Sequence, residues 1–209
     1  RQFMRPMDLV AFSVKIKESD LLIYAQTDLT EFSYAVLDRE RRNLEAYIRY
    51  QPEFLRSLVP LSIDEFAPPI CKLMAQAGAK AQVGPMAAVA GAVNDRLASE
   101  LLYKSSELII ENGGDVLIHS SKERKIAIYA GEASPFRSHI GLLLPPGGTW
   151  GIATSSGQIG HSLSFGKADT VTIVAENSAL ADAWATSIGN RVKAKKDIEP
   201  TLKFCETIE

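Results

Sequence analysis

The chain has 209 residues, of which 46% are hydrophobic and 23% charged, and its formal net charge is −2. A chain of this size can bury a core without a disulfide or a structural metal, and its two cysteines, Cys71 and Cys205, form no metal-binding cluster. Lys and Arg are dispersed apart from two short runs, and no stretch approaches the ~20 apolar residues of a membrane span. We therefore expect a cytoplasmic protein that binds neither nucleic acid nor a membrane. Two reduced thiols are expected, with one long-range disulfide as the alternative.

The first 50 residues predict a β-hairpin followed by a long helix. Apolar and polar residues alternate over 9–17, turn-forming residues follow at 18–20, and an apolar strand resumes at 21–25. Thr30 is the expected N-cap of an amphipathic helix, because apolar residues recur at helical spacing as far as Tyr50.

Two shorter helices are predicted next. The first spans about 70–77 and ends at Gly78. The second begins at Gly84-Pro85 and continues through the small residues of 86–92, with Pro85 in the first turn, where no amide donor is needed. Small side chains allow a helix to approach a neighbouring backbone or a ligand closely. This helix is therefore either packed tightly inside the molecule, part of a binding site, or a docking face for another subunit.

The second half of the chain predicts several strands and one last helix. The helix is expected to be capped by Asn177 or Ser178 and to end near Gly189. The strand patterns occupy residues 107–110, 116–119, 125–129, 140–144 and 170–175.

Mixed hairpins and helices predict an α+β layered fold, in which mixed or antiparallel sheets pack against helices. We expect a single domain over residues 1–209, with an N-terminal lobe at 1–80 and a ligand-binding half at 81–209. A homodimer is left open.

Two glycine-rich segments carry polar groups. Residues 111–115 read Glu-Asn-Gly-Gly-Asp directly after a strand, which is typical either of a tight hairpin or of a backbone that lies close to a ligand. Residues 151–169 hold four glycines, four serines, a threonine and His161. Free amides and hydroxyls of this kind suit an anionic phosphate, although a flexible surface loop would have a similar composition.

Asp182 and Thr186 lie four positions apart on the last predicted helix, so their oxygens share one face. A carboxylate beside a hydroxyl is a ligand pair suited to Mg²⁺. The alternative is that Asp182 is favoured near a helix N-terminus by the helix dipole alone.

Taken together and in this order, these segments resemble the ApbE family of FAD:protein FMN transferases over about residues 84–190. The match is to a shorter branch that carries ENGGD, GIATSSG and GHSxSFGKAD. The residues that carry the resemblance are Gly84-Pro85-Met86, Gly113-Gly114-Asp115, Thr154-Ser155-Ser156-Gly157 with His161, and Ala181-Asp182-Ala183-Trp184-Ala185-Thr186 after an apolar strand.

The resemblance implies a Mg²⁺ ion held partly by Asp182 and Thr186 beside the pyrophosphate of FAD. It also implies catalytic roles for Asp182 and for His161, the latter as a base or phosphate ligand, although a buried structural histidine is equally compatible. The residues expected to lie against the dinucleotide are Met86, Asn112, Gly113, Gly114, Asp115, Thr154, Ser155, Ser156, Gly157 and Gly160.

The function implied is a Mg²⁺-dependent transfer of FMN from FAD to a hydroxyl of an acceptor protein, or a related nucleotide-phosphoryl reaction. One departure favours an alternative. After His161 this chain reads Ser-Leu-Ser-Phe-Gly, where the transferases have a stretch resembling Ile-Ile-Asp-Pro-x-Thr-Gly. A non-catalytic protein that binds flavin or another small ligand is therefore the second hypothesis.

Overall fold

A six-stranded antiparallel sheet forms the centre of the molecule. The computed structural model describes residues 6–132, 134–136, 139–156 and 166–208. The strand order is β1-β2-β3-β4-β7-β8, and a separate two-stranded sheet pairs β5 with β6. The strands are β1 (Val10–Ile16), β2 (Ser19–Ala25), β3 (Leu108–Asn112), β4 (Asp115–His119), β5 (Arg124–Ile128), β6 (Ile140–Leu144), β7 (Thr149–Ser155) and β8 (Val171–Ala175).

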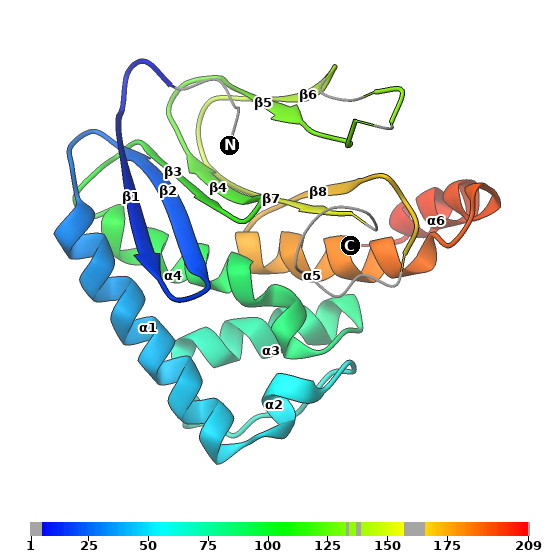
Figure 1. The fold of residues 1–209 in the computed structure, drawn as a ribbon, viewed down its shortest axis with the longest axis horizontal. Helices are drawn as coiled ribbons and strands as arrows, with labels where there is room; N and C mark the ends of the chain where they lie inside the picture. Colours follow the sequence, from blue (N-terminus) through cyan, green and yellow to red (C-terminus); the bar gives the residue numbers. More distant parts are fainter. Residues whose placement is uncertain (1–5, 133, 137–138, 157–165, 209) are drawn as a thin grey trace.

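The helices cover one face of the central sheet, and the β5–β6 hairpin lies over the other (Figure 1). Helices α4 and α5 lie next to the sheet, and α1, α2 and α3 form an outer layer. The α-helices are α1 (Thr30–Tyr50), α2 (Glu53–Arg56), α3 (Pro69–Ala81), α4 (Val89–Leu101), α5 (Ser178–Arg191) and α6 (Ile198–Cys205), and the short 3₁₀ helices are η1 (Pro85–Ala88) and η2 (Lys195–Asp197). This antiparallel sheet packed against helices confirms the predicted α+β layered fold.

Both halves of the chain contribute to one sheet and one core. Strand β2 pairs with β3, with Leu21 opposite Asn112. The main hydrophobic core combines buried side chains from β1, β2, α1 and α3 with those of α4 and α5. A smaller cluster centred on Ile118, Leu144 and Ile152 joins the β5–β6 hairpin to the sheet.

Several predicted boundaries were wrong because packing overrides local sequence signals. Helix α3 continues through Gly78 to Ala81 and ends at Gln82, which takes the left-handed conformation. Gly78 is a packing residue rather than a stop signal, because a Cβ atom there would lie 2.9 Å from the Val83 carbonyl oxygen. Thr30 is the first residue of α1 rather than its N-cap, which is Leu29, and no side chain caps the helix. The Thr30 amide donates to the Asp28 carboxylate just before the helix, at 2.8 Å. The first hairpin turn also lies earlier than predicted, because Ile16 already pairs with Ser19.

Four elements were missed in the sequence: strand β7, helix α6, the one-turn helix α2 and the short 3₁₀ helix η2. Strand β7 occupies the start of the segment 151–169 that was interpreted as a loop, and α6 follows the helix that was expected to be the last. Strand β7 is flanked by glycine and hydroxyl residues rather than by a long apolar run, so its sequence pattern is weak.

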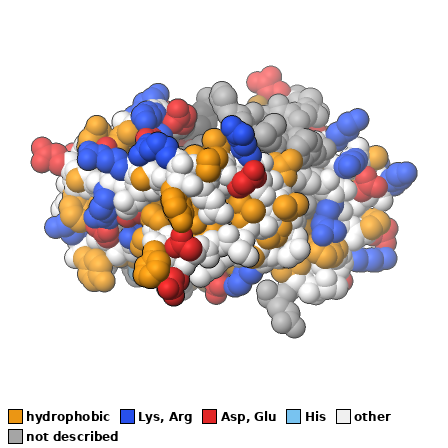
Figure 2. All heavy atoms as spheres, turned by 90° about the horizontal axis from the view of Figure 1, so that it is seen from below, with side chains coloured by type: hydrophobic (Ala, Val, Ile, Leu, Met, Phe, Trp, Pro, Cys, Tyr) orange, Lys and Arg blue, Asp and Glu red, His pale blue; other side chains and the backbone are white. Residues whose placement is uncertain are grey.

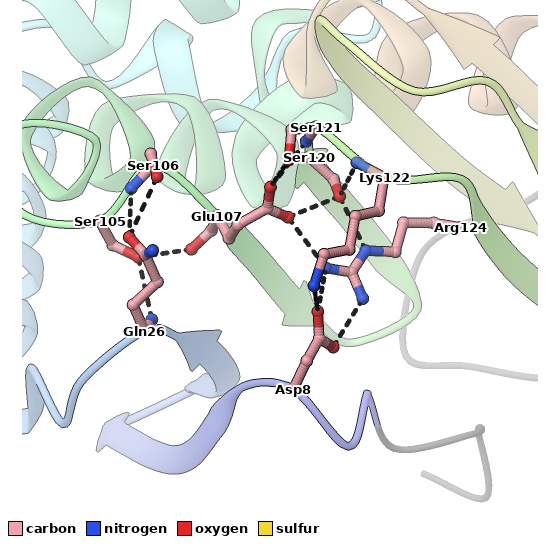
Figure 3. A network of polar contacts seen from close by, with 9 residues as sticks. All are labelled: Asp8, Gln26, Ser105, Ser106, Glu107, Ser120, Ser121, Lys122 and Arg124. Atoms are coloured by element: carbon pink, nitrogen blue, oxygen red, sulfur yellow. Dashed lines mark hydrogen bonds and ion pairs between the residues drawn. The ribbon is translucent and has the colours of Figure 1, made fainter.

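An ionic network fastens the β5–β6 hairpin and the N-terminal segment to the central sheet (Figure 3). Arg124 forms ion pairs with Asp8 and Glu107, both at 2.9 Å, and Lys122 also contacts Asp8. Glu107 accepts further hydrogen bonds from Ser120 and Ser121. Because its members come from residues 8, 107 and 120–124, this network joins three separate parts of the chain.

The outer face of the helical layer mixes apolar side chains with charges of both signs (Figure 2). Among the described residues, no helix combines the length and hydropathy that crossing a bilayer would require.

Candidate functional site

The candidate site lies where α4 and α5 approach each other, and a carboxylate from each helix binds the start of the other. Asp95 of α4 accepts hydrogen bonds from the amides of Ser178 and Ala179, both at 2.9 Å. Asp182 of α5 accepts one from the amide of Gly91 at 3.1 Å and another from the amide of Ala90. Helix N-termini present unpaired amides and favour negative charge, so each carboxylate stabilises the neighbouring helix.

Small residues make this close approach possible. A Cβ atom on Gly91 would lie 2.1 Å from the carbonyl oxygen of Ser178. On the sheet side, a Cβ atom on Gly151 of β7 would lie 2.2 Å from the backbone of Asn177. The small residues of the predicted helix at 86–92 are thus used largely inside the molecule, which argues against a docking face there.

The β3–β4 hairpin brings the predicted residues Asn112 and Asp115 to the site, and the predicted glycines form its turn. Gly113 and Gly114 form its two-residue turn with φ of 65° and 106°, a conformation that glycine adopts without strain. The turn is exposed, and a side chain on either glycine would meet nothing within 4 Å. At its base Asn112 donates a hydrogen bond to the Ala90 carbonyl oxygen at 3.3 Å, and Asp115 follows at the start of β4.

Asp115 and Asp182 are partly buried carboxylates that repel each other electrostatically. Burial, together with the charge of Asp182, raises the pKa of Asp115 well above its usual range, although the Thr154 amide hydrogen bond opposes the shift. Burial raises the pKa of Asp182 to about 7 against the hydrogen bonds from Gly91 and Ala90, and the charge of Asp95 adds to the shift. None of these three aspartates forms an ion pair with Lys, Arg or His within the described part of the chain.

The chemistry of these donors fits a hard divalent cation. Carboxylates that are partly removed from water and have no cationic partner among the described residues are costly, and a bound cation would reduce both their repulsion and the desolvation cost. The described residues contain no ready-made cluster of three or more His, Cys, Asp or Glu ligands. Mg²⁺ does not require such a cluster, because it commonly binds one or two carboxylates and completes its coordination with water and phosphate.

Thr186 and Thr154 supply hydroxyl groups near the carboxylates. Thr186 follows Asp182 by one turn of α5, is partly exposed, and forms no side-chain hydrogen bond with a described residue. The Thr154 hydroxyl lies 3.0 Å from that of Thr172 on β8, and Ser155 ends β7. The helical spacing leaves Thr186 available to act together with Asp182.

The other predicted site residues are less informative. Met86 lies on η1 and packs against the main core. Ser156 is partly buried just beyond β7. Gly157, Gly160 and His161 lie outside the described residues, so their assignments remain predictions.

A shallow groove of about 410 Å³ lies elsewhere, between the C-terminal half of α1 and residues 64–68. It is lined by Tyr47, Tyr50 and Phe66 among others, and none of the candidate site residues borders it. The carboxylates and hydroxyls described above lie at the α4–α5 junction, so the candidate site is there rather than in this groove.

Two residues of the site were missed in the sequence, Asn94 and Asp95. Both follow the small-residue run of α4, and Asn94 occupies a buried helix position that an apolar residue would normally take. Two consecutive polar residues directly after a run of small, core-facing residues were the sequence feature that could have revealed their role.

The fold described here is that of the ApbE flavin transferases. The chain superimposes on flavin transferase ApbE from Vibrio cholerae, H257G mutant, with a TM-score of 0.61 over 95% of this chain and 91% of that one, at 13% identity. Flavinyl transferase ApbE from Pseudomonas stutzeri gives a TM-score of 0.60 over 91% and 86% of the two chains, at 12% identity.

The chain belongs to the family described as AbpE bacteria, whose model matches residues 1–202. It is also similar to UPF0280 proteins of methanogenic archaea. The protein of Methanothermobacter thermautotrophicus is 46% identical over 160 residues, which are 76% of this chain and 62% of that protein. The protein of Methanococcus vannielii is 41% identical over 97% of this chain and 84% of its own length.

Proposed function

We propose that this protein is a Mg²⁺-dependent flavin transferase that uses FAD. The observation that carries the proposal is the partly buried pair Asp115 and Asp182, which has no cationic side-chain partner among the described residues and whose Asp182 binds the first-turn amides of α4. The ApbE fold and the order of the matching motifs support the flavin substrate.

In this proposal Asp182 and Thr186 hold the metal, and Asp115 adds negative charge beside it. Bound Mg²⁺ would neutralise charge on the pyrophosphate. The phosphoanhydride bond of FAD breaks, a phosphoester bond forms between the FMN phosphorus and a Ser or Thr oxygen of an acceptor protein, and AMP leaves. The acceptor hydroxyl loses its proton, for which His161 is the proposed base.

The glycine turn at 113–114, the end of β7 at Thr154 and Ser155, and the sequence that follows as far as Gly157 are proposed to lie against the dinucleotide. The exposed turn, with no packing partner for either glycine, supports this placement because a ligand could approach its backbone. The proposal includes a single domain, a cytoplasmic location, and no nucleic-acid or membrane partner, and it leaves a homodimer open.

The test is FAD binding by titration calorimetry with and without Mg²⁺, using the parent, Asp182→Ala and the control Asp38→Ala. Asp38 is an aspartate on α1 that pairs with Arg42. We expect Mg²⁺-dependent binding in the parent and control, and its loss in Asp182→Ala. Equal binding by Asp182→Ala would contradict the metal assignment.

Catalysis is tested separately by measuring AMP release from FAD in the presence of candidate acceptor proteins. AMP release with covalent flavin fluorescence on the acceptor supports the transferase. Tight flavin binding without turnover of FAD would favour the accessory flavin-binding protein, which the altered sequence after His161 also suggests.

A further inference from the structure

Residues Asn94 and Asp95 of α4 lie between the two elements that carry the site carboxylates. Asp95 binds the start of α5 through two amides, and Asn94 contacts the start of β4. The Asn94 Nδ2 atom donates to the Asp115 carbonyl oxygen at 3.1 Å and lies 3.4 Å from the Ser178 hydroxyl. One dipeptide therefore contacts both the strand that begins with Asp115 and the helix that carries Asp182.

The start of α5 has no amide left for a ligand. Ser178 and Ala179 donate to Asp95, Leu180 donates to the Asn177 side chain at 2.8 Å, and Ala181 donates to the Asn177 carbonyl oxygen. Both carboxylate oxygens of Asp95 are engaged in these bonds at 2.9 Å. Asp95 is thereby arranged to hold α5 in place rather than to bind a ligand directly.

Asn94 is fully buried, and its amide has only one orientation that suits its neighbours. A carbonyl oxygen can only accept, so the Asp115 carbonyl requires Nδ2 rather than Oδ1 to face it. The Asn94 Oδ1 atom then finds no donor among the described residues. A buried acceptor of this kind is normally satisfied by an ordered water, and water is also what a hydrated Mg²⁺ carries.

We propose that Asn94 and Asp95 are positioning residues of the metal site: they fix the start of β4 and the start of α5, and so hold the elements that carry Asp115 and Asp182 in place before the ion binds. This inference rests on the proposed function. In metal centres generally, groups that orient the ligands influence affinity without touching the ion, and their loss typically weakens binding 10- to 100-fold.

The test compares Mg²⁺ affinity by calorimetry in the parent, Asp95→Asn and Asn94→Leu. Asn at 95 has one acceptor oxygen instead of two, and Leu at 94 keeps the branched shape and the same number of side-chain heavy atoms without the amide, although its methyl groups are bulkier. The control is Ser105→Ala, which removes a buried hydroxyl that accepts from the Gln26 amide at 3.0 Å and does not contact the site. Thermal unfolding is recorded for each protein, and binding is measured well below the lowest midpoint.

We expect Kd for Mg²⁺ to rise about 10- to 100-fold in both site variants and to stay unchanged in Ser105→Ala, although all three lower the midpoint of unfolding. A merely structural role would lower the midpoint and leave Kd at the parent value, which would overturn the inference. If Asn94→Leu does not fold, Asn94→Ser keeps a polar group with a shorter reach and is expected to show the same rise in Kd.

The two proposals fail in different ways. If the parent binds Mg²⁺ and the site variants bind it equally well, only the positioning role is overturned. A parent that binds no Mg²⁺ with or without FAD overturns the proposed function and the positioning role together.

Discussion

Among single residues, Asp182 places a negative charge where no cationic side chain of the described residues pairs with it. We predict that Asp182→Asn stabilises the metal-free protein at pH 8, because it keeps nearly the same shape and removes the repulsion with Asp115. The expected gain in free energy of unfolding is about 1–3 kcal/mol, measured by urea denaturation in the presence of a chelator. The same change in partly exposed Asp38, which pairs with Arg42, should have little effect.

A loss of stability in Asp182→Asn would instead mean that the bonds to Gly91 and Ala90 outweigh the repulsion. With Mg²⁺ added, the parent should become more stable than Asp182→Asn, because only the parent gains binding energy from the ion.

The two cysteines differ sharply in their surroundings. Cys71 is buried, and burial, with a smaller effect from nearby Glu40, raises the pKa of its thiol to about 12. Cys205 is partly exposed, and both thiols are free. We predict that a thiol reagent modifies one cysteine per folded chain at pH 8 and two per chain after denaturation, as counted by mass spectrometry. Rapid modification of Cys71 in the folded protein would contradict this.

At the scale of elements, α1 is joined to α4 by a buried ion pair. Glu40 is 1% exposed and pairs with Arg96 at 3.2 Å and with Arg39 at 3.1 Å. We predict that Glu40→Ala lowers the free energy of unfolding by about 3–5 kcal/mol, because Arg96 then loses its partner. The double variant Glu40→Leu with Arg96→Met should recover much of this loss. Chemical denaturation checks both values, and a double variant no more stable than Glu40→Ala would refute the explanation.

Sequence patterns predicted most of the helices and strands, and each element that was missed or misplaced has its own physical reason. The N-cap of α5 at Asn177 and strand β6 were predicted correctly, since local capping and apolar patterns determine them. Strand β7 depends on its pairing with β4 and β8, which no local pattern records. The end of α3 is set by the turn at Gln82, a non-glycine residue in the left-handed conformation, which the sequence does not mark as a stop. The same holds at the candidate site. Asp182, Asp115, Asn112 and Thr154 were singled out, whereas Asp95 was missed because its role is defined by a partner 83 positions away.

At the scale of the whole molecule, the network around Glu107 should make stability depend on acid. Burial alone would raise the pKa of Glu107, but hydrogen bonds from Ser120 and Ser121 and from Arg124 outweigh it and lower that pKa to about 2. Arg124 and Lys122 likewise lower the pKa of Asp8.

A carboxylate with a lowered pKa stabilises the folded state most above its unfolded pKa, and this contribution is lost as the pH falls toward the folded value. We therefore predict that the free energy of unfolding drops between about pH 4.5 and 2 and that Glu107→Gln makes this part of the pH profile shallower. Urea denaturation at several pH values measures the slope. An unchanged slope in Glu107→Gln would show that other carboxylates cause the acid sensitivity.

The pairing of β2 with β3 has a consequence for how the chain is made. Residues 26–107 lie between the two strands, so the ribosome must synthesise all of them before β2 meets its partner. At 5–20 residues per second this takes about 4–16 s. During that interval the apolar side chains of the first hairpin, including Leu21 and Ile23, have no sheet to pack in, and the nascent chain is a natural client for a chaperone.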